Sequence, residues 1–376
     1  MKKSYYFYSV FSALVVLMFI FASCTKEGPA GPAGANGTDG TNGSDGTNGV
    51  DGNVSCLVCH TAVNMDEIAA TLDTHKHVTG SSWGRGTSAS CGMCHSSDGF
   101  IEFARSGEAV GAAVSTHLTC VTCHSNHGSL EDGIDAPMRY LGPVQSIAVE
   151  GHVYDHGAGN LCATCHQARR ASSGIDNQTE HKTYSRTFTG DDIAVYQAHG
   201  AIGPAGTMEL MNDTLFVTFD VPTTYVYTNS THAGPHHGPQ SNIFAADIGT
   251  VAGTPFTRDH HTDCVSCHVA TELPGAGHGF APDVAKCNEC HGDAFNMFAE
   301  QEGIIIRLAA VGAALEAIGA IHIAEDGVHP MYASLERAKW NAFWNYMCLV
   351  EDKSAGLHNF GYAKQLLTAA ESALGL

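Results

Sequence analysis

A short stretch in the second half of the chain alternates between apolar and polar positions. Thr214–Val221 reads "TLFVTFDV", with apolar side chains at every second residue and many β-branched and aromatic types. This period of two predicts a β-strand with one buried face. Thr223–Thr228, "TTYVYT", follows Pro222 and is expected to pair with that strand. The pattern predicts a small β insertion near residues 205–230.

The C-terminal part, residues 301–376, has a helical pattern instead. Gly303–Ala324 is apolar but interrupted by Arg307 and Glu316, which predicts a packed helix and not a membrane span. Apolar residues recur at helical spacing in Met331–Val350, and a further helix is expected over Tyr362–Leu374. We therefore expect a mainly α fold with few regular strands, in which C-terminal helices pack on the domain before them.

The N-terminus has the pattern of an export signal. Lys2 and Lys3 precede the apolar run Val10–Ala22, which is too short to span a bilayer. The run ends in "FASC", which is typical of a bacterial lipoprotein cleavage site at Cys24. We expect residues 1–23 to be a lipoprotein signal peptide and Cys24 to be lipidated, which would tether an exported protein to a membrane, most simply the outer membrane, facing the periplasm or the cell surface. The alternative is an ordinary secretory signal followed by an incidental cysteine.

Glycine recurs at every third position from Gly28 to Gly52. Strict Gly-x-y spacing is typical of collagen, since only glycine fits the axis of three wound chains. The run is short and poor in proline, so a flexible hydrated tether is the other interpretation. Residues 24–54 are therefore predicted to be a spacer, which would also permit a trimer.

The formal net charge of −20 indicates which classes of binding partner are electrostatically favoured. Nucleic acid and anionic membrane surfaces are disfavoured, because like charges repel. Cationic partners or metal ions are electrostatically more favourable, and a merely solubilising surface is the alternative.

One string, Cys-x-x-Cys-His, occurs six times and holds 12 of the 14 cysteines. A random chain of this composition would hold roughly 0.03 copies. Zinc sites need two such pairs and no histidine after each pair, and a redox-active dithiol needs one motif in a thioredoxin-like setting. The copies run over Cys56–His60, Cys91–His95, Cys120–His124, Cys162–His166, Cys264–His268 and Cys287–His291.

This string is the attachment site of c-type haem, in which two cysteines form thioethers to the vinyl groups and the histidine binds iron. We therefore predict six covalently bound haems c, a hexahaem-binding domain over residues 55–300, and a core formed by the haems, so that the apoprotein does not fold stably. The proximal ligands would be His60, His95, His124, His166, His268 and His291. The thioether cysteines would be Cys56, Cys59, Cys91, Cys94, Cys120, Cys123, Cys162, Cys165, Cys264, Cys267, Cys287 and Cys290.

Seventeen histidines remain outside the strings, which makes a second histidine ligand feasible at every haem. Methionine is the competing ligand, but the chain has only ten. His127 lies one helical turn past His124, so it would serve a neighbouring haem. The distal candidates are His127, His278, His358, His75, His117, His152 and His232, with His77, His156, His236 and His237 beside them in the same runs.

Two stretches resemble a known group. "FWNYMCLVEDKSAGLHNFGYAKQLL" is similar to the long C-terminal helix and Gly-x-His-Asn turn of multihaem cytochromes related to nitrite reductase, hydroxylamine oxidoreductase and tetrathionate reductase. "GHGFAPDVAKCNECHG" is similar to the stretch before a late haem in that group. The resemblance implies a mostly helical fold around packed haems, with His358 and His278 as iron ligands. The Cys-x-x-Cys-Lys string of pentahaem nitrite reductases is absent from this sequence.

Three functions remain open from the sequence. The first is an electron conduit that serves other cytochromes or redox proteins, extracellular metal oxides or a soluble enzyme. The second is an oxidoreductase for a nitrogen or sulfur oxyanion at one open haem, with proton donors from His232–His237 or His260–His261 and with Arg169 and Arg170 beside the fourth motif. The third is a structural stalk or filament subunit with stacked haems. The conduit is preferred, with no catalytic residue assigned.

Overall fold

The structure is a computed structural model, and its described residues are 61–125, 138–174, 179–200, 202–254, 263–269, 274–283, 285–286 and 296–376. They all belong to one of two compact units, Gly52–Leu376. The other unit, Met1–Asp51, lies outside the described residues, and with it the predicted signal peptide, Cys24 and most of the spacer. Among the described residues, no helix combines the length and apolar character that crossing a membrane requires.

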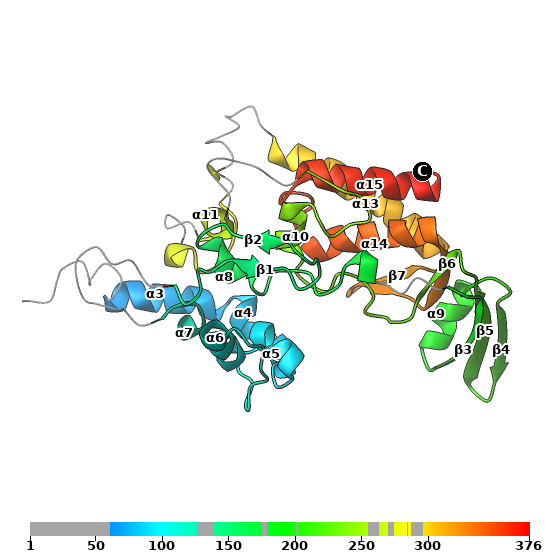
Figure 1. The fold of residues 1–376 in the computed structure, drawn as a ribbon, viewed down its shortest axis with the longest axis horizontal. Coiled ribbons are helices and arrows are strands. Elements are labelled where there is room, and N and C mark those ends of the chain that lie inside the picture. Colours follow the sequence, from blue (N-terminus) through cyan, green and yellow to red (C-terminus); the bar gives the residue numbers. More distant parts are fainter. Residues whose placement is uncertain are drawn as a thin grey trace, which may run out of the picture. The chain divides into compact units, whose positions relative to one another are not determined.

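The haem-motif region consists of short helices joined by loops (Figure 1). Polar caps explain several starts, because a side-chain oxygen there satisfies a backbone N–H of the first turn. Asp263, for example, accepts from Ser266 N at 2.7 Å and begins α11. The helices are α3 (Ala62–Asp73), α4 (Lys76–Thr79), η1 (Ser82–Arg85), α5 (Ala89–His95), α6 (Ser97–Ser106), α7 (Cys120–Cys123), α8 (Gly159–Ala163), η2 (Ser172–Gly174), α10 (Gln240–Ala245), α11 (Cys264–His268) and η3 (Pro274–Gly277), with β1 (Val144–Gln145) paired to β2 (Val153–Tyr154).

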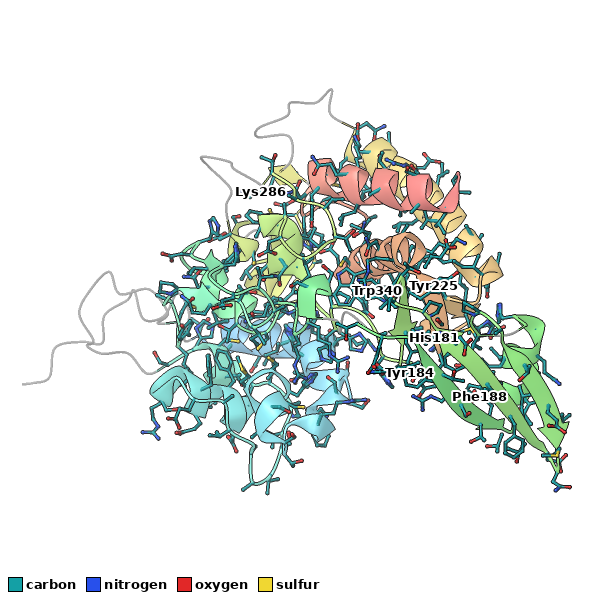
Figure 2. The ribbon with its side chains drawn as sticks, turned by 45° about the vertical axis from the view of Figure 1, so that its right-hand side comes forward. His181, Tyr184, Phe188, Tyr225, Lys286 and Trp340 are labelled. Atoms are coloured by element: carbon teal, nitrogen blue, oxygen red, sulfur yellow. The ribbon has the colours of Figure 1, made fainter. Side chains whose placement is uncertain are left out.

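The predicted strand is confirmed as β5 (Thr214–Val221). It is the centre of a three-stranded antiparallel sheet with β3 (Lys182–Thr189) and β4 (Thr207–Met211), and α9 (Asp192–Ala198) packs against β3. Alternate β5 side chains from Leu215 to Val221 are buried, as the period of two requires. They pack with aromatic residues that include Phe188 and Tyr184 (Figure 2).

The insertion differs from the sequence prediction in two respects. It begins at Lys182, well before residue 205, because β3 pairs with β5 along its whole length. The second predicted strand, β6 (Tyr225–Thr228), pairs with β9 (Ala333–Glu336) and not with β5. The prediction of a local hairpin was wrong, since the β6 partner lies more than 100 residues away in sequence. This pairing joins the insertion to the C-terminal region.

The C-terminal helices are α13 (Met297–Ala317), α14 (Arg337–Asp352) and α15 (Phe360–Leu374) (Figure 1). The helix predicted over 303–324 ends at Ala317, because Gly319 adopts a left-handed φ of +71°. The chain then forms a hairpin of β7 (Ile321–Ala324) and β8 (Gly327–Pro330). The helix predicted over 331–350 begins only at Arg337, because Ala333–Glu336 form β9.

These helices enclose an apolar core of their own. Phe343, Trp344 and Leu366 are fully buried there, and each contributes about 1.5–3 kcal/mol of hydrophobic free energy. Trp344 Nε1 donates to Ile248 O at 2.9 Å, which fixes the loop before α11 on the helices. Side chains therefore fill the core of the C-terminal region, while the core of haems predicted for the motif region stays a prediction. The dependence of the motif region on haem stays a prediction.

Candidate iron-ligating histidine pairs

Four of the six Cys-x-x-Cys-His strings lie among the described residues, and each includes a short helix. The second string ends α5, the third and fifth begin α7 and α11, and the fourth overlaps the end of α8. Residues three and four apart lie on the same face of a helical turn. The helical turn therefore presents both cysteines and the histidine on one side, as attachment to a flat macrocycle requires.

Each of these four motif histidines has a second histidine ring facing it. His95 and His236 have ring centroids 6.3 Å apart, and His124 and His278 are 6.2 Å apart. The other two pairs are His166 with His77 at 6.1 Å and His268 with His358 at 6.3 Å.

These separations match two imidazoles on opposite sides of one metal ion. A metal–imidazole bond is about 2 Å and a ring nitrogen lies about 1.15 Å from the ring centroid, so trans imidazoles have centroids roughly 6.3 Å apart. Direct ring packing brings centroids closer, as for His75 and His77 at 4.6 Å. All four described motif histidines fit the spacing of an iron bound by two histidines.

Hydrogen bonds at Nδ1 orient several of these rings. The Nδ1 of His268 donates to Phe280 O at 2.8 Å, and that of His278 donates to Gly275 O at 2.9 Å. Carbonyl oxygens only accept, so Nδ1 carries the proton and Nε2 keeps its lone pair for a metal. Metal-bound histidines typically have such a partner at their other nitrogen.

The histidine pairs of the fourth and fifth motifs are connected by a chain of hydrogen bonds. His166 Nδ1 donates to Gln240 Oε1 at 3.1 Å, and Gln240 Nε2 donates to Asp352 O at 3.1 Å. Asp352 in turn accepts from His358 Nδ1 at 2.6 Å through a side chain that is 0% exposed. His166 of the fourth motif and His358, which lies beside the fifth motif, are thus oriented by the same hydrogen-bond network.

Burial favours the neutral, metal-binding form of several of these rings by lowering their pKa. Burial, with His166 and His75 as lesser causes, lowers the pKa of His77 to about 3. Burial also lowers the pKa of His236 to about 4, and it lowers the pKa of His166. His358 differs: burial lowers its pKa, but the Asp352 carboxylate outweighs burial and the net shift is upward. A metal displaces a proton from an imidazole more readily when its pKa is low.

The structure places the other predicted ligands elsewhere. His75 caps α4 by accepting from His77 N at 3.2 Å, and its neighbour His77 is the ring that faces His166. His232 is exposed, with its Nδ1 3.3 Å from Thr231 Oγ1, whereas His236 faces His95. Sequence reasoning named both runs but could not choose between their histidines.

His152 and His117 also have partners other than motif histidines. His152 Nδ1 lies 3.2 Å from Asp247 Oδ2, and His117 Nδ1 lies 2.9 Å from the carbonyl oxygen of Leu118. His278 and His358, expected from the family resemblance, lie beside His124 and His268. The remaining predicted site residues lie outside the described part of the chain: Cys24, Cys56, Cys59, His60, His127, Cys287, Cys290 and His291.

The motifs are close neighbours through their cysteines. The Cys94 and Cys165 side chains lie within hydrogen-bonding reach of each other, and so do Cys162 and Cys264. The thiol pKa values differ among the motifs: burial raises the pKa of Cys123 to about 11, whereas hydrogen bonding with Cys162 lowers the pKa of Cys264 to about 7. In the haem-bound protein these sulfur atoms would be thioethers, so the fourth motif lies between the second and the fifth.

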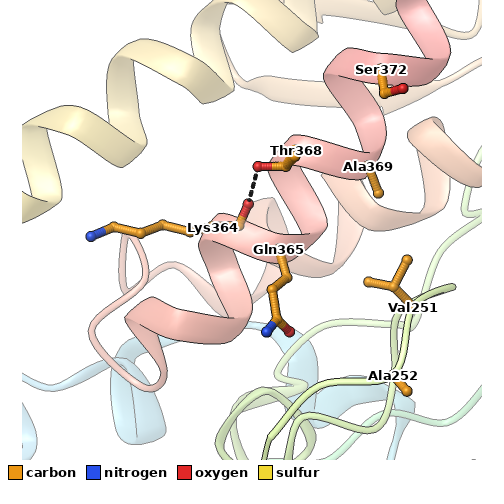
Figure 3. A pocket seen from close by; sticks show the side chains of 7 residues that line it. All are labelled: Val251, Ala252, Lys364, Gln365, Thr368, Ala369 and Ser372. Atoms are coloured by element: carbon orange, nitrogen blue, oxygen red, sulfur yellow. Dashed lines mark hydrogen bonds between the residues drawn. The ribbon is translucent and has the colours of Figure 1, made fainter.

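Two cavities in the described part of the chain differ in their distance from the haem motifs: one has arginines next to the fourth motif, and the other has no motif residue in its lining. One, of about 590 Å³, is lined by Arg169, Arg170, Tyr184 and Tyr227 among others. Arg169 is near enough to help lower the pKa of both His95 and His236, so it is placed to pair with an anionic group there. The other cavity lies beside α15 and is not lined by any residue of a haem motif (Figure 3). Its one cationic lining residue, Lys364, forms an ion pair with Glu300 at 2.6 Å.

No protein-family model and no curated protein matches this chain. Two solved structures resemble it, each over part of its own length. The outer cell wall cytochrome OcwA has 20% sequence identity and a TM-score of 0.41, with 81% of this chain and 48% of that chain covered. An undecaheme cytochrome from the S-layer of Carboxydothermus ferrireducens has 18% identity and the same TM-score, with 81% and 40% covered. The chain thus spans less than half of either protein.

Proposed function

We propose that this protein is an exported hexahaem c-type cytochrome that conducts electrons from haem to haem. The observation that carries the proposal is the pairing of all four described motif histidines with a second imidazole at 6.1–6.3 Å. The spacing of the two cysteines in each string fits the two vinyl groups of one haem. Six strings in the sequence give the count of six.

In this proposal, two histidines of the chain would hold the iron at each of the four described motifs. Bound haem supplies a one-electron iron couple. Two imidazoles, kept in place by Nδ1 bonds such as that of His278 to Gly275 O, give the two redox states the same ligands. They also exclude water and small substrates from the iron. Both effects suit electron transfer better than substrate turnover.

The motif order supports a relay of at least three centres. The side-chain contacts Cys94–Cys165 and Cys162–Cys264 bring the second, fourth and fifth motifs together. Gln240 connects the ligand pairs of the fourth and fifth motifs. An electron that enters near α5 would reach α11 through the motif at α8.

Export and partners complete the proposal. The signal peptide, Cys24 and the Gly-x-y spacer would anchor the protein at the outer membrane and hold the haem region away from the lipid. Other cytochromes or extracellular metal oxides would be its redox partners. A trimer through the spacer belongs to the same proposal.

One observation favours the oxidoreductase as a second candidate. The cavity with Arg169 and Arg170 offers positive charge to an oxyanion beside the His95 pair. Turnover there would need an open iron, yet the His236 ring lies 6.3 Å from the His95 ring, a spacing that fits a second histidine on the same iron. We therefore place the conduit first.

The test uses the purified mature protein. Mass spectrometry is expected to show six covalently bound haems, and the oxidised protein is expected to give only low-spin signals by electron paramagnetic resonance. A high-spin signal worth one haem in six would favour the oxidoreductase. A polypeptide mass without haem, or with zinc in its place, would overturn the proposal.

A further inference from the structure

A cluster of three possible metal ligands lies outside every haem motif. His199 follows α9 in the insertion, Glu316 is in the last turn of α13, and His322 is on β7. One ligand atom from each lies within 4.8 Å of the other two. The ring centroids of His199 and His322 are 6.2 Å apart. The four described haem pairs do not use any of these residues.

We propose that His199, Glu316 and His322 bind a divalent transition-metal ion, of which Zn²⁺ is the reference case. His322 Nδ1 and Glu316 Oε1 are 3.2 Å apart, and two ligand atoms bound tetrahedrally to zinc are separated by about 3.3 Å. Imidazoles that share one ion have centroids between about 5 Å and about 6.3 Å apart, depending on the angle at the metal. The observed 6.2 Å lies at the wide end of that range, so the two rings would move closer together to bind one ion tetrahedrally.

The donor types select the class of ion. Imidazole nitrogen suits zinc, copper, iron, cobalt and nickel, whereas magnesium and calcium prefer oxygen ligands. Two histidines and one carboxylate are a recurrent set for zinc and for iron(II), with positions left for water. All three side chains are partly exposed, so water can complete the coordination.

The surrounding backbone holds two of the ligands in place. Ile323 N donates to Glu316 Oε1 at 2.9 Å, which turns the carboxylate toward β7. Gly319 sits in the turn between α13 and β7, where an added Cβ would lie 3.3 Å from His199 Cβ. A side chain at Gly319 would therefore press on His199 in addition to straining the left-handed turn. The turn needs glycine to bring the three ligands together.

The ion would join two parts of the chain. His199 comes from the β insertion, whereas Glu316 and His322 come from the C-terminal region. A metal bridge would fix the end of α9 to the α13–β7 turn, next to the β6–β9 pairing that already joins these regions. Binding to the folded state alone would raise thermal stability.

The test uses the full chain with its haems, stripped of loosely bound metal by a chelator and then titrated with ZnCl₂. Zinc and iron are counted by mass spectrometry of the metals, and zinc affinity is measured by calorimetry. We expect one zinc per six irons, and an affinity at least tenfold weaker in His199→Ala, His322→Ala and Glu316→Gln. The thermal midpoint should rise with zinc in the wild type and not in these variants.

His181→Ala is the matched control. His181 is another insertion histidine paired with a carboxylate, Asp220 at 3.2 Å, but among the described residues no third ligand accompanies that pair. It should bind zinc like the wild type. An unchanged haem absorption spectrum checks that each variant is folded, and Glu316→Gln keeps the side-chain shape if the alanine variants do not fold. Equal zinc binding by the wild type and Glu316→Gln together with His322→Ala, or no zinc bound by the wild type, would overturn the proposal.

Discussion

The rings of three described histidine pairs differ in the group that accepts the Nδ1 proton. His268 and His278 donate to backbone carbonyls, His166 donates to the Gln240 amide, and His358 donates to the Asp352 carboxylate. A stronger acceptor makes the imidazole a better electron donor to its metal, which stabilises the oxidised ion. If the pairs hold haem, the fifth motif should therefore have a lowered reduction potential.

Asp352→Asn tests this effect. The amide is a weaker acceptor, so the potential of one haem should rise by on the order of tens of millivolts. A potentiometric titration followed by visible absorption would measure the change. Glu351→Gln is the matched control, because Glu351 makes a similar bond at 2.7 Å to His237, which is not the ring that faces His95. A shift of the same size in the control, or none in Asp352→Asn, would contradict the assignment.

The second motif has three histidines of one short run as candidates for its second ligand: His232, His236 and His237. His236→Ala should leave one iron with a single axial histidine and give one high-spin haem per chain. His237→Ala and His232→Ala should leave all haems low-spin, since His237 pairs with Glu351 and His232 is exposed. Electron paramagnetic resonance of the oxidised variants distinguishes these outcomes. A high-spin haem in His232→Ala instead would favour the interpretation made from sequence alone.

The motif histidines could be predicted as iron ligands because five residues define each candidate attachment site. His278 and His358 were predicted from the family resemblance, and their rings lie beside those of His124 and His268. His77 and His236 did not follow, because each lies within a few residues of another histidine and only the backbone decides which ring faces the motif. The Nδ1 of His75 accepts a hydrogen bond from His77 N and caps α4. His236 has a left-handed φ of +77° in the segment between Pro235 and Gly238. Such local geometry is invisible in the one-dimensional pattern.

At the scale of elements, local patterns were predictable and distant partners were not. The alternation of Thr214–Val221 fixed β5, since a period of two has few other interpretations. The partner of β6 is set by packing against α14 and β9, so no local signal identifies it. The same holds for β7, where an apolar run long enough for a helix turns into a strand after Gly319. Apolar runs alone do not separate helix from strand.

The loop before α11 depends on α15 for its position. The Tyr362 hydroxyl accepts from Gly249 N at 2.7 Å and donates to Val251 O at 3.3 Å. Tyr362→Phe would leave the partly buried Gly249 N without this acceptor, and because a fully buried unpaired donor costs about 1–3 kcal/mol, we expect a loss at the low end of that range. We expect a lower thermal midpoint of the helical circular dichroism signal.

Tyr225→Phe is the control for that change. Its hydroxyl is bonded to the Glu336 carboxylate at 3.3 Å on the surface, where water can replace the bond. The midpoint should move little. Equal losses in the two variants would contradict the role of Tyr362 in holding the loop.

At the scale of the whole molecule, the sequence carries few positive charges: 18 Lys and Arg against 38 Asp and Glu. Several of the described cations are already paired, such as Arg307 with Glu371 at 2.7 Å. A surface of this sign attracts cations over a distance of about 10 Å at 0.1 M salt. Redox partners that approach through positive patches would therefore be favoured over anionic ones.

Small redox reagents of opposite charge test this preference directly. Oxidation of the reduced protein by a cationic ruthenium ammine should slow by about tenfold as salt rises from about 10 mM to about 500 mM, because screening removes the attraction. Oxidation by anionic ferricyanide should accelerate over the same range. Stopped-flow absorption of the haems gives both rates on one sample. If the two responses are reversed, so that the ruthenium ammine accelerates and ferricyanide slows as salt rises, then electron exit is governed by a local positive patch, such as the one around Arg169, and not by the charge of the whole chain.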